Sequence, residues 1–363
     1  MKPRILILAQ TPPPYHGQAL MQELLVKSSW NWADKKHIRL EFSDNFSNVG
    51  KFQFNKILKL FIVILKVHKY RIHGPIDLLY YPPTGTYLVP TLRDIILLLC
   101  IRWTTKKVAF HFHAGGFDNS RNFPVIKYFA KIAYNAPDLA IVLLKSLESE
   151  VLWINPKNIV VIPNGIQDEF IDRDKNNDVF TILSVGNLIK GKGVYILLEA
   201  INNVIKSGLQ VKAEFVGAWG NNKFKTLCEE FVVNNKMEKV INFEGVKTGK
   251  DKWKYYSRAN IFCFPSYLTE NQPVVLLEAM MAGLPIITSK WRALPDIVID
   301  GWNGLVIPPA SVEDLTQAIL YLYNNTLICQ QMGEHSRKSY ENDYRLDNYT
   351  MKLESSIKEL IQN

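Results

Sequence analysis

Two glutamates, Glu270 and Glu278, stand eight positions apart, and the segment around the second is almost wholly apolar. Pro273 suits the first turn of a helix and Gly283 suits its end, so the sequence predicts a helix over 273–282. A charged carboxylate on a buried helix is costly unless other groups donate hydrogen bonds to it. No basic residue lies three or four positions from Glu278. We therefore interpret Glu278 as a carboxylate that accepts from hydroxyl groups, for example those of a ribose.

The opening of this helix predicts an anion site. The first N–H groups of a helix have no partner within it and lie at the positive end of its dipole, which suits a phosphate. Here the opening residues are Asn271, Gln272, Pro273 and Val274. The simpler alternative is that Glu278 pairs with a distant lysine or arginine and that Glu270 is an ordinary loop charge.

Two histidines, His111 and His113, follow a strand pattern and should project on the same side of that strand. This spacing alone would allow a metal site, but no third cluster of ligands is evident in the sequence, and we expect no metal. His113 comes just before an Ala-Gly-Gly turn. It could bond to a substrate, or it could simply close the end of the strand.

The elements that must position these residues form two domains of an α/β fold. A chain of 363 residues is long enough for about two domains. Short apolar runs alternate with helical patterns, which is typical of parallel, doubly wound sheets. The strands that this pattern predicts cover residues 4–9, 78–81, 107–111, 139–143, 158–162, 181–185, 212–216, 241–244, 261–264, 285–288 and 304–307.

A polar stretch over 168–178 interrupts this alternation and suits a connection between domains. We therefore expect an N-terminal domain over 1–167 and a C-terminal domain over 168–345. A last helix over about 346–363 has no strand after it and could pack back on the first domain. Because ligands of open parallel sheets bind beyond the carboxyl ends of the strands, two such domains would face a central cleft that holds the site.

Composition narrows the class of protein. Apolar residues make up 47% and charged residues 21%, as in a soluble globular protein, and the net charge of +9 favours anionic partners. The four cysteines form no CxxC pair, and the first apolar run is too short for a signal peptide. No apolar stretch approaches the roughly 20 residues of a spanning helix. We expect a cytoplasmic protein.

Residues 51–71 carry a basic pattern without any acidic residue. At about 100° per residue, five of its six basic side chains fall within an arc of roughly 140°, opposite an apolar side. The basic residues are Lys51, Lys56, Lys59, Lys66, Lys69 and Arg71, and the apolar side consists of Phe54, Ile57, Leu58, Phe61, Ile64 and Leu65. Such a helix can lie on an anionic membrane. It can equally be an ordinary helix with its apolar side in the core.

Taken together, the motifs resemble those of the retaining GT-B glycosyltransferases of family four, the glycosyl transferases of group 1. Glu270 and Glu278, with the Ala-Met-Met-Ala-Gly-Leu-Pro that follows, resemble the E-x7-E signature of that family. Four further segments match the family in order: residues 161–166 (Val-Ile-Pro-Asn-Gly-Ile), the phosphate loop over 183–193, residues 262–266 (Phe-Cys-Phe-Pro-Ser) and residues 300–306.

The resemblance implies two Rossmann-like domains, the first for the acceptor and the second for a nucleotide-sugar donor. It implies that Glu278 binds the ribose, that Glu270 and His113 lie near the donor sugar, and that Lys192 binds the diphosphate. Gly17 and Gln18 match the family's first loop, where a glycine lets backbone N–H groups approach an anion. His16 fits a loop position or an acceptor contact. No metal or other cofactor is implied.

The acceptor that the resemblance suggests is a glycan or a lipid-linked sugar, in bacterial surface polysaccharide biosynthesis. Many relatives act on lipid-linked acceptors at a membrane surface, which favours membrane contact by residues 51–71.

One position departs from the family pattern. Where the family often has an arginine beside the lysine of the phosphate loop, this chain has Asn187. A neutral amide removes a bidentate contact to phosphate. We take Arg292, in the segment after the strand over 285–288, as the candidate replacement, against the simpler role of a solvated surface arginine.

Two other functions are compatible with parts of the sequence. A nucleotide-sugar epimerase could use the same scaffold and would release an altered sugar without any acceptor. A nucleic-acid-binding protein could use the net charge of +9, but the basic residues are dispersed apart from one helix and no binding module is recognised. A nicotinamide-dependent oxidoreductase is disfavoured because the turn after the first strand lacks GxGxxG.

Overall fold

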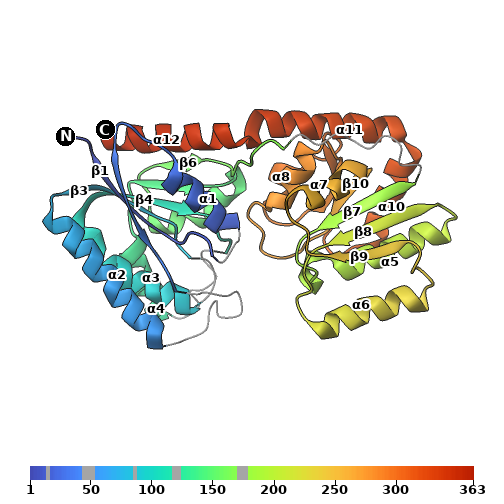
Figure 1. Cartoon of the computed structure of the whole chain (residues 1–363), viewed down its shortest axis with the longest axis horizontal. Helices are drawn as coiled ribbons and strands as arrows, with labels where there is room; N and C mark the ends of the chain where they lie inside the picture. The colour runs from blue at the N-terminus through green and yellow to red at the C-terminus, as the bar shows by residue number, and fades with distance from the viewer. Residues whose placement is uncertain (14–16, 43–53, 85–87, 117–123, 170–178) are drawn as a thin grey trace. The chain divides into compact units, whose positions relative to one another are not determined.

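The computed structural model describes residues 1–13, 17–42, 54–84, 88–116, 124–169 and 179–363. His16, Lys51 and most of the expected polar connection over 168–178 lie outside these ranges. The chain divides into two compact units, as Figure 1 shows in colours that run from blue at the N-terminus to red at the C-terminus. The first unit comprises Met1–Asn164 together with Asp347–Asn363, and the second comprises Gly165–Leu346.

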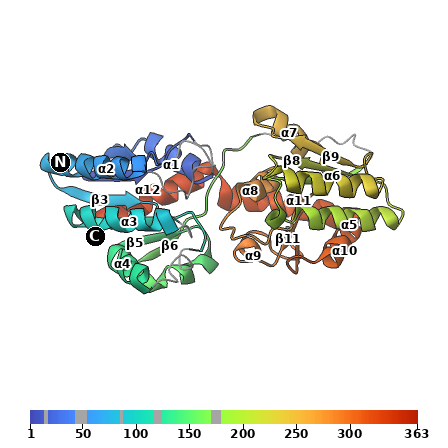
Figure 2. The same ribbon diagram turned by 90° about the horizontal axis from the view of Figure 1, so that it is seen from below.

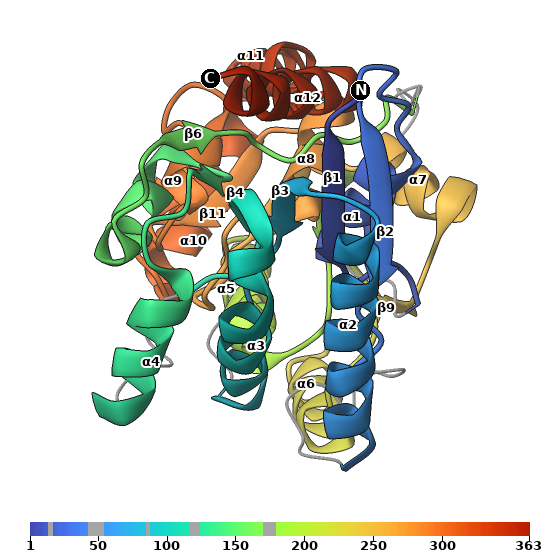
Figure 3. The ribbon, with the colours of Figure 1, turned by 90° about the vertical axis from the view of Figure 1, so that its left-hand side faces the viewer.

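The first unit is built on a parallel six-stranded sheet of order β2-β1-β3-β4-β5-β6. Its strands are β1 (Arg4–Ala9), β2 (Asp34–Arg39), β3 (Ile76–Tyr81), β4 (Thr105–Phe112), β5 (Leu139–Val142) and β6 (Ile159–Val161). Its helices are α1 (Gly17–Lys27), α2 (Phe54–Ile72), α3 (Leu88–Ile101), α4 (Pro124–Tyr134) and α12 (Leu346–Gln362). Right-handed crossovers place α1 on one face of the sheet and α2, α3 and α4 on the other, as Figure 3 shows for these three helices.

The second unit has a parallel six-stranded sheet of order β12-β11-β10-β7-β8-β9. Its strands are β7 (Phe180–Val185), β8 (Val211–Val216), β9 (Ile241–Gly245), β10 (Ile261–Phe264), β11 (Ile286–Ser289) and β12 (Gly304–Ile307). Its helices are α5 (Val194–Lys206), α6 (Asn222–Asn234), α7 (Gly249–Arg258), α8 (Val274–Met281), α9 (Leu294–Ile297), α10 (Val312–Asn324) and α11 (Thr326–Ser339), seen from below in Figure 2.

These sheets confirm the expected α/β class with two doubly wound, Rossmann-like domains. All eleven expected strands are present, and their ends differ from the expected ones by two residues at most. One strand, β2, was not expected. Its sequence, Asp-Lys-Lys-His-Ile-Arg, carries few apolar residues because β2 is an edge strand, and only Ile38 is buried.

The last helix packs on the first unit. The Trp32 indole N–H donates to Glu354 Oε1 at 2.8 Å, and Lys107 Nζ donates to the carbonyl of Leu360 at 2.6 Å. The buried side of α12 consists of Tyr349, Leu353 and Ile357. The first unit is therefore completed by the last residues of the chain.

Helix α2 contradicts one of the two alternatives for residues 51–71, an ordinary helix with the predicted apolar side in the core. Of the apolar side predicted there, Ile64 is buried, whereas Ile57, Leu58, Phe61 and Leu65 are exposed. The buried residues of α2 are instead Leu60, Val63, Ile64 and Val67. Because α2 is apolar on two sides, the sequence pattern alone could not tell which side meets the sheet.

Candidate functional site

The phosphate-loop segment of the second unit packs directly on the loop that follows β10. The 3-10 helix η6 (Lys190–Lys192) follows β7, a neighbour of β10 in the sheet. The Tyr267 N–H donates to the carbonyl of Gly191 at 2.9 Å. Gly193 has φ 76°, and a Cβ there would lie 2.3 Å from the carbonyl oxygen of Pro265. Only glycine allows this approach, which brings Lys192 beside Glu270.

Lys192 and Glu270 form an ion pair between Nζ and Oε1. Ser266 Oγ also donates to Glu270 Oε1, at 3.2 Å, and Lys192 Nζ lies 4.9 Å from the centre of the Phe264 ring. Both charged side chains are largely shielded from water, with 21% and 15% of their surface exposed. The pair brings together two residues that the sequence placed in different motifs.

Glu278 lies on α8, which the sequence predicted over 273–282 and which spans Val274–Met281. The residue is 8% exposed. Lys252 Nζ lies 2.5 Å from its Oε1, and Tyr256 Oη donates to its Oε2 at 2.8 Å. Both partners come from α7. The simpler alternative, pairing with a distant lysine, is thus realised by Lys252, while binding of a ribose by Glu278 stays a prediction.

The contact with Glu278 changes the chemistry of Tyr256. Burial raises the pKa of this phenol well above its usual value, and the negative charge of Glu278 adds to the effect. Tyr256 therefore stays protonated and remains a hydrogen-bond donor to the carboxylate. Neither Lys252 nor Tyr256 was found from the sequence, because they precede Glu278 by 26 and 22 positions.

Helix α8 is fixed at both ends. Pro273 has extended backbone angles and is the N-cap, one position before the place predicted for it, so the helical residues begin at Val274. Asn271 and Gln272, immediately before it, are buried. At the other end Arg337 donates to the carbonyl of Met281 at 2.8 Å. Within the first turn the Leu276 N–H donates to the carbonyl of Pro273 at 3.0 Å, and anion binding by residues 271–274 stays a prediction.

Asn187, which stands where the family often has an arginine, and Arg292, the candidate replacement for that arginine, lie in different loops of the second unit. Asn187 is exposed in the loop after β7. Arg292 lies in the turn after β11 and has φ 49°. A left-handed backbone is uncommon for a residue with a side chain and is often kept at functional positions. The binding roles of Asn187 and Arg292 stay predictions.

The first unit holds a buried polar cluster at the end of β4. As predicted, His111 and His113 project on the same side, with ring centres 3.9 Å apart. Gln22 of α1 lies with its Nε2 2.8 Å from His113 Nε2, and Tyr80 Oη lies 2.6 Å from His111 Nδ1. Burial and the neighbouring His113 hold the pKa of His111 well below its usual value, so His111 is neutral.

Gln22 and Tyr80 connect the two histidines of this cluster. Gln22 Nε2 lies beside His113 Nε2 and also donates to Tyr80 Oη at 3.5 Å. The Tyr80 phenol in turn lies beside His111 Nδ1. Gln22 and Tyr80 were not found from the sequence because they lie 91 and 31 positions from their histidine partners.

The remaining predicted residues of the first unit, Gly17 and Gln18, are the first two residues of α1 and are partly exposed. Gly17 thus stands at a helix start, as the sequence suggested. In the described ranges, no group of three or more histidine, cysteine, aspartate or glutamate side chains could hold a metal ion.

Comparison with solved structures identifies the fold. Anabaena HepE, crystallised with UDP and glucose, superposes with a TM-score of 0.74 at 17% identity, covering 98% of this chain and 99% of that one. Sucrose-phosphate synthase of Thermosynechococcus elongatus gives 0.76 at 16% identity, covering 99% and 100%. The chain has the GT-B fold of glycosyltransferases.

Comparison of sequences places the resemblance to known proteins mainly in the second unit. Residues 166–339, most of the second unit, match the family model of glycosyl transferases group 1. The capsular polysaccharide biosynthesis glycosyltransferase CapM of Staphylococcus aureus is 25% identical over 251 residues, 63% of this chain and 65% of that protein. An uncharacterized glycosyltransferase of Methanocaldococcus jannaschii is 29% identical over 215 residues, 58% and 57%. The second unit thus resembles glycosyl transferases group 1, and these matches span less than two thirds of either relative.

Proposed function

We propose that this protein is a retaining glycosyltransferase that moves a sugar from a nucleotide-diphosphate sugar to a glycan or lipid-linked acceptor in bacterial surface polysaccharide biosynthesis. The observation that carries the proposal is the pair of lysine–glutamate contacts, Lys192 with Glu270 and Lys252 with Glu278, set beside the opening turn of α8. CapM and the group 1 family model support the reaction class and the polysaccharide setting.

The diphosphate leaving group would be stabilised by Lys192 and by the first N–H groups of α8. An ammonium group has three donor hydrogens, so Lys192 can keep its bond to Glu270 and still donate to a phosphate oxygen. Positive groups aimed at the negative charge that develops on a leaving group lower the barrier to its departure. No metal ion is needed in this scheme.

Glu278 would bind the ribose of the donor. A carboxylate offers about four acceptor positions, and the two protein contacts to Lys252 and Tyr256 leave room for ribose hydroxyls. The same two contacts hold the carboxylate in one position before the donor arrives. The helix would thus offer the donor a preformed acceptor group.

Glu270 and His113 would act on the donor sugar by positioning it rather than by forming a bond to it. The Glu270 carboxylate is paired with an ammonium and accepts from Ser266, which makes it a weak nucleophile. His113 is held by Gln22 at one ring nitrogen. We assign hydrogen bonding to a sugar hydroxyl to His113 and electrostatic support to Glu270.

The proposal includes a cytoplasmic location with peripheral contact at the inner face of the membrane through α2. In the described part of the chain no helix is both long and apolar enough to cross a bilayer. Helix α2 contains no acidic residue and has Lys69 and Arg71 in its last turn. These features support attraction to an anionic surface.

A donor screen tests the proposed reaction. The purified protein is incubated with UDP-, GDP- and ADP-sugars, beginning with UDP-glucose because HepE was crystallised with UDP and glucose, and release of the nucleoside diphosphate is measured. We expect release from one nucleotide class, with a sharp loss in Glu278→Gln and none in Glu229→Gln, an exposed glutamate of α6.

Product analysis completes this test. With an acceptor, NMR of the new linkage should show the anomeric configuration of the donor. Failure of all three classes to be cleaved or bound would contradict the proposal. So would cleavage that Glu278→Gln leaves unchanged, and an altered donor sugar released without acceptor would instead show an epimerase.

A further inference from the structure

Helix α2 exposes an apolar stripe that none of the described residues of the first unit covers. The exposed apolar residues of α2 are Ile57, Leu58, Phe61, Ile62, Leu65 and Ile72. At about 100° per residue they fall within an arc of roughly 140°, and Leu65 is 67% exposed. The stripe is separate from the side of α2 that packs on the sheet.

The two neighbouring helices carry matching stripes. On α3 the exposed apolar residues are Leu88, Leu92, Ile96 and Leu99, and on α4 they are Val125, Tyr128, Phe129 and Ile132. Both sets follow the three- and four-residue spacing of one helix side. Helix α3 contacts α2 and α4, and the three lie side by side on one face of the sheet (Figure 3).

Together with Trp103, just after α3 and 73% exposed, these stripes form what we call the three-helix surface. It holds 15 of the 28 large apolar side chains that are exposed in the described ranges. Single exposed apolar residues are normal on a protein, but this concentration on adjacent helices marks an interaction surface.

The charge of this region identifies the partner. Helices α2 and α4 contain no acidic residue, and Asp94, the one acid of α3, is buried against Arg93. Lys66 and Lys69 on α2 and Lys127 and Lys131 on α4 are exposed beside the stripes. A second copy of the chain would bring these lysines against each other, whereas an anionic lipid surface complements them.

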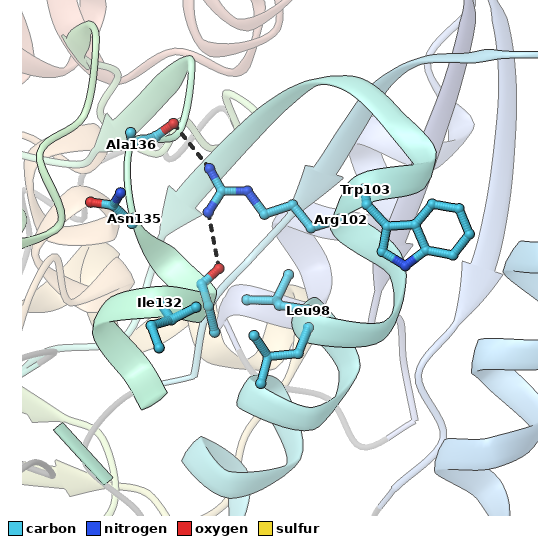
Figure 4. A pocket seen from close by; sticks show the side chains of 8 residues that line it. Leu98, Arg102, Trp103, Ile132, Asn135 and Ala136 are labelled. Atoms are coloured by element: carbon cyan, nitrogen blue, oxygen red, sulfur yellow. Dashed lines mark hydrogen bonds between the residues drawn. The ribbon is translucent and has the colours of Figure 1, made fainter. Parts of the chain in front are cut away.

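A hollow lies within the surface where α3 and α4 end. It has a volume of about 530 Å³ and is lined mainly by Leu98, Leu99, Trp103 and Ile132, with Arg102 at its polar end (Figure 4). The Arg102 guanidinium donates to the carbonyls of Ala133 and Ala136 at 3.1 and 3.0 Å. The hollow is thus apolar along α3 and α4, and Arg102 connects the two helix ends beside it.

We infer that the three-helix surface inserts into the outer part of an anionic phospholipid bilayer. Its apolar stripes would enter the acyl region by about 5–10 Å while the flanking lysines contact lipid phosphates. This goes beyond charge attraction by α2, because α3, α4 and Trp103 take part and apolar burial carries the binding. It deepens the proposed function by bringing the chain to membrane-held acceptors.

Flotation of the full chain with vesicles tests the inference. Vesicles of phosphatidylglycerol and phosphatidylcholine are compared with vesicles of phosphatidylcholine alone, without donor or acceptor. We expect binding to the anionic vesicles, and at least a tenfold loss of binding in Leu65→Glu with Phe129→Glu. The matched control is Leu227→Glu with Val233→Glu, two exposed apolar residues of α6 in the second unit.

The outcomes separate this inference from the proposed reaction. Circular dichroism should show that all variants are folded, and donor hydrolysis in detergent should be unchanged in Leu65→Glu with Phe129→Glu. Equal vesicle binding by this variant and the control would overturn the inference. So would binding that 0.5 M salt abolishes completely, since that shows charge attraction alone, or a dimer in size-exclusion chromatography that the variant converts to monomer.

Discussion

The two units of this chain differ in how their functional residues are encoded. In the second unit, Lys192, Glu270 and Glu278 lie in short motifs at the ends of neighbouring strands. In the first unit, the histidine cluster joins residues from α1, β3 and β4, and the three-helix surface spans three separate helices. Motifs therefore point to individual residues, whereas the contacts between them, the surfaces and the buried clusters emerge only when the chain is folded.

Loss of Lys192 should give the largest effect and would show that the second unit carries the charge stabilisation. We expect Lys192→Gln to lower kcat for donor cleavage by roughly 100- to 1000-fold, because a group aimed at the leaving diphosphate is removed. Lys190→Gln, an exposed lysine of the same turn, is the control. Steady-state kinetics measures both, and equal losses would show that the effect is not specific to Lys192.

Variants of Glu278 and Tyr256 should distinguish the carboxylate that binds the donor from the phenol that holds this carboxylate in place. We expect Glu278→Gln to raise the donor KM roughly 10- to 100-fold, because hydrogen bonds to a charged group are lost. Tyr256→Phe removes only the phenol that holds Glu278 and should raise KM less, by about fivefold. A Tyr256→Phe effect larger than that of Glu278→Gln would contradict this order.

The buried His111 of the first unit should make stability depend on pH. Its pKa is lowered in the folded state, so the unfolded chain binds the proton more readily below about pH 6.5, the usual histidine value. The contribution of neutral His111 to the free energy of unfolding is present above this pH. It is lost as the pH falls, by about 1.4 kcal/mol per pH unit at most.

Urea unfolding between pH 5 and 8 measures this dependence. The variant His111→Asn keeps an acceptor for Tyr80 but does not titrate in this range. The difference in unfolding free energy between the two proteins should shrink as the pH falls. A constant difference would show that His111 is not the titrating group.

Substitution of Arg292 should have the smallest effect on donor binding, and it tests whether this residue compensates for the altered phosphate loop. If Arg292 replaces the arginine missing at position 187, Arg292→Ala should raise the donor KM by about fivefold, as expected for a partly exposed ion pair. Lys290→Ala, from the same turn and exposed, should change it little. An unchanged KM in Arg292→Ala would remove this residue from the site.

Much of the fold could be predicted because buried parallel strands are continuous apolar runs. The polar edge strand β2 escaped this rule, and the two apolar sides of α2 could not be ranked without its neighbours. For the candidate site, Glu270, Glu278 and Lys192 could be predicted from their motifs. Lys252, Tyr256 and Gln22 were not, since each reaches its partner across 22 to 91 positions of chain.

Helix α12 carries a consequence for how the first unit could be isolated. Residues 347–363 follow the second unit along the chain yet belong to the first, and Tyr349 lies with its ring 6.4 Å from that of His111. The first unit therefore draws on segments from both sides of the second unit. A fragment cut before residue 346 would lack Tyr349 beside the histidine cluster, so a faithful truncation of the first unit has to join residue 164 to residue 347.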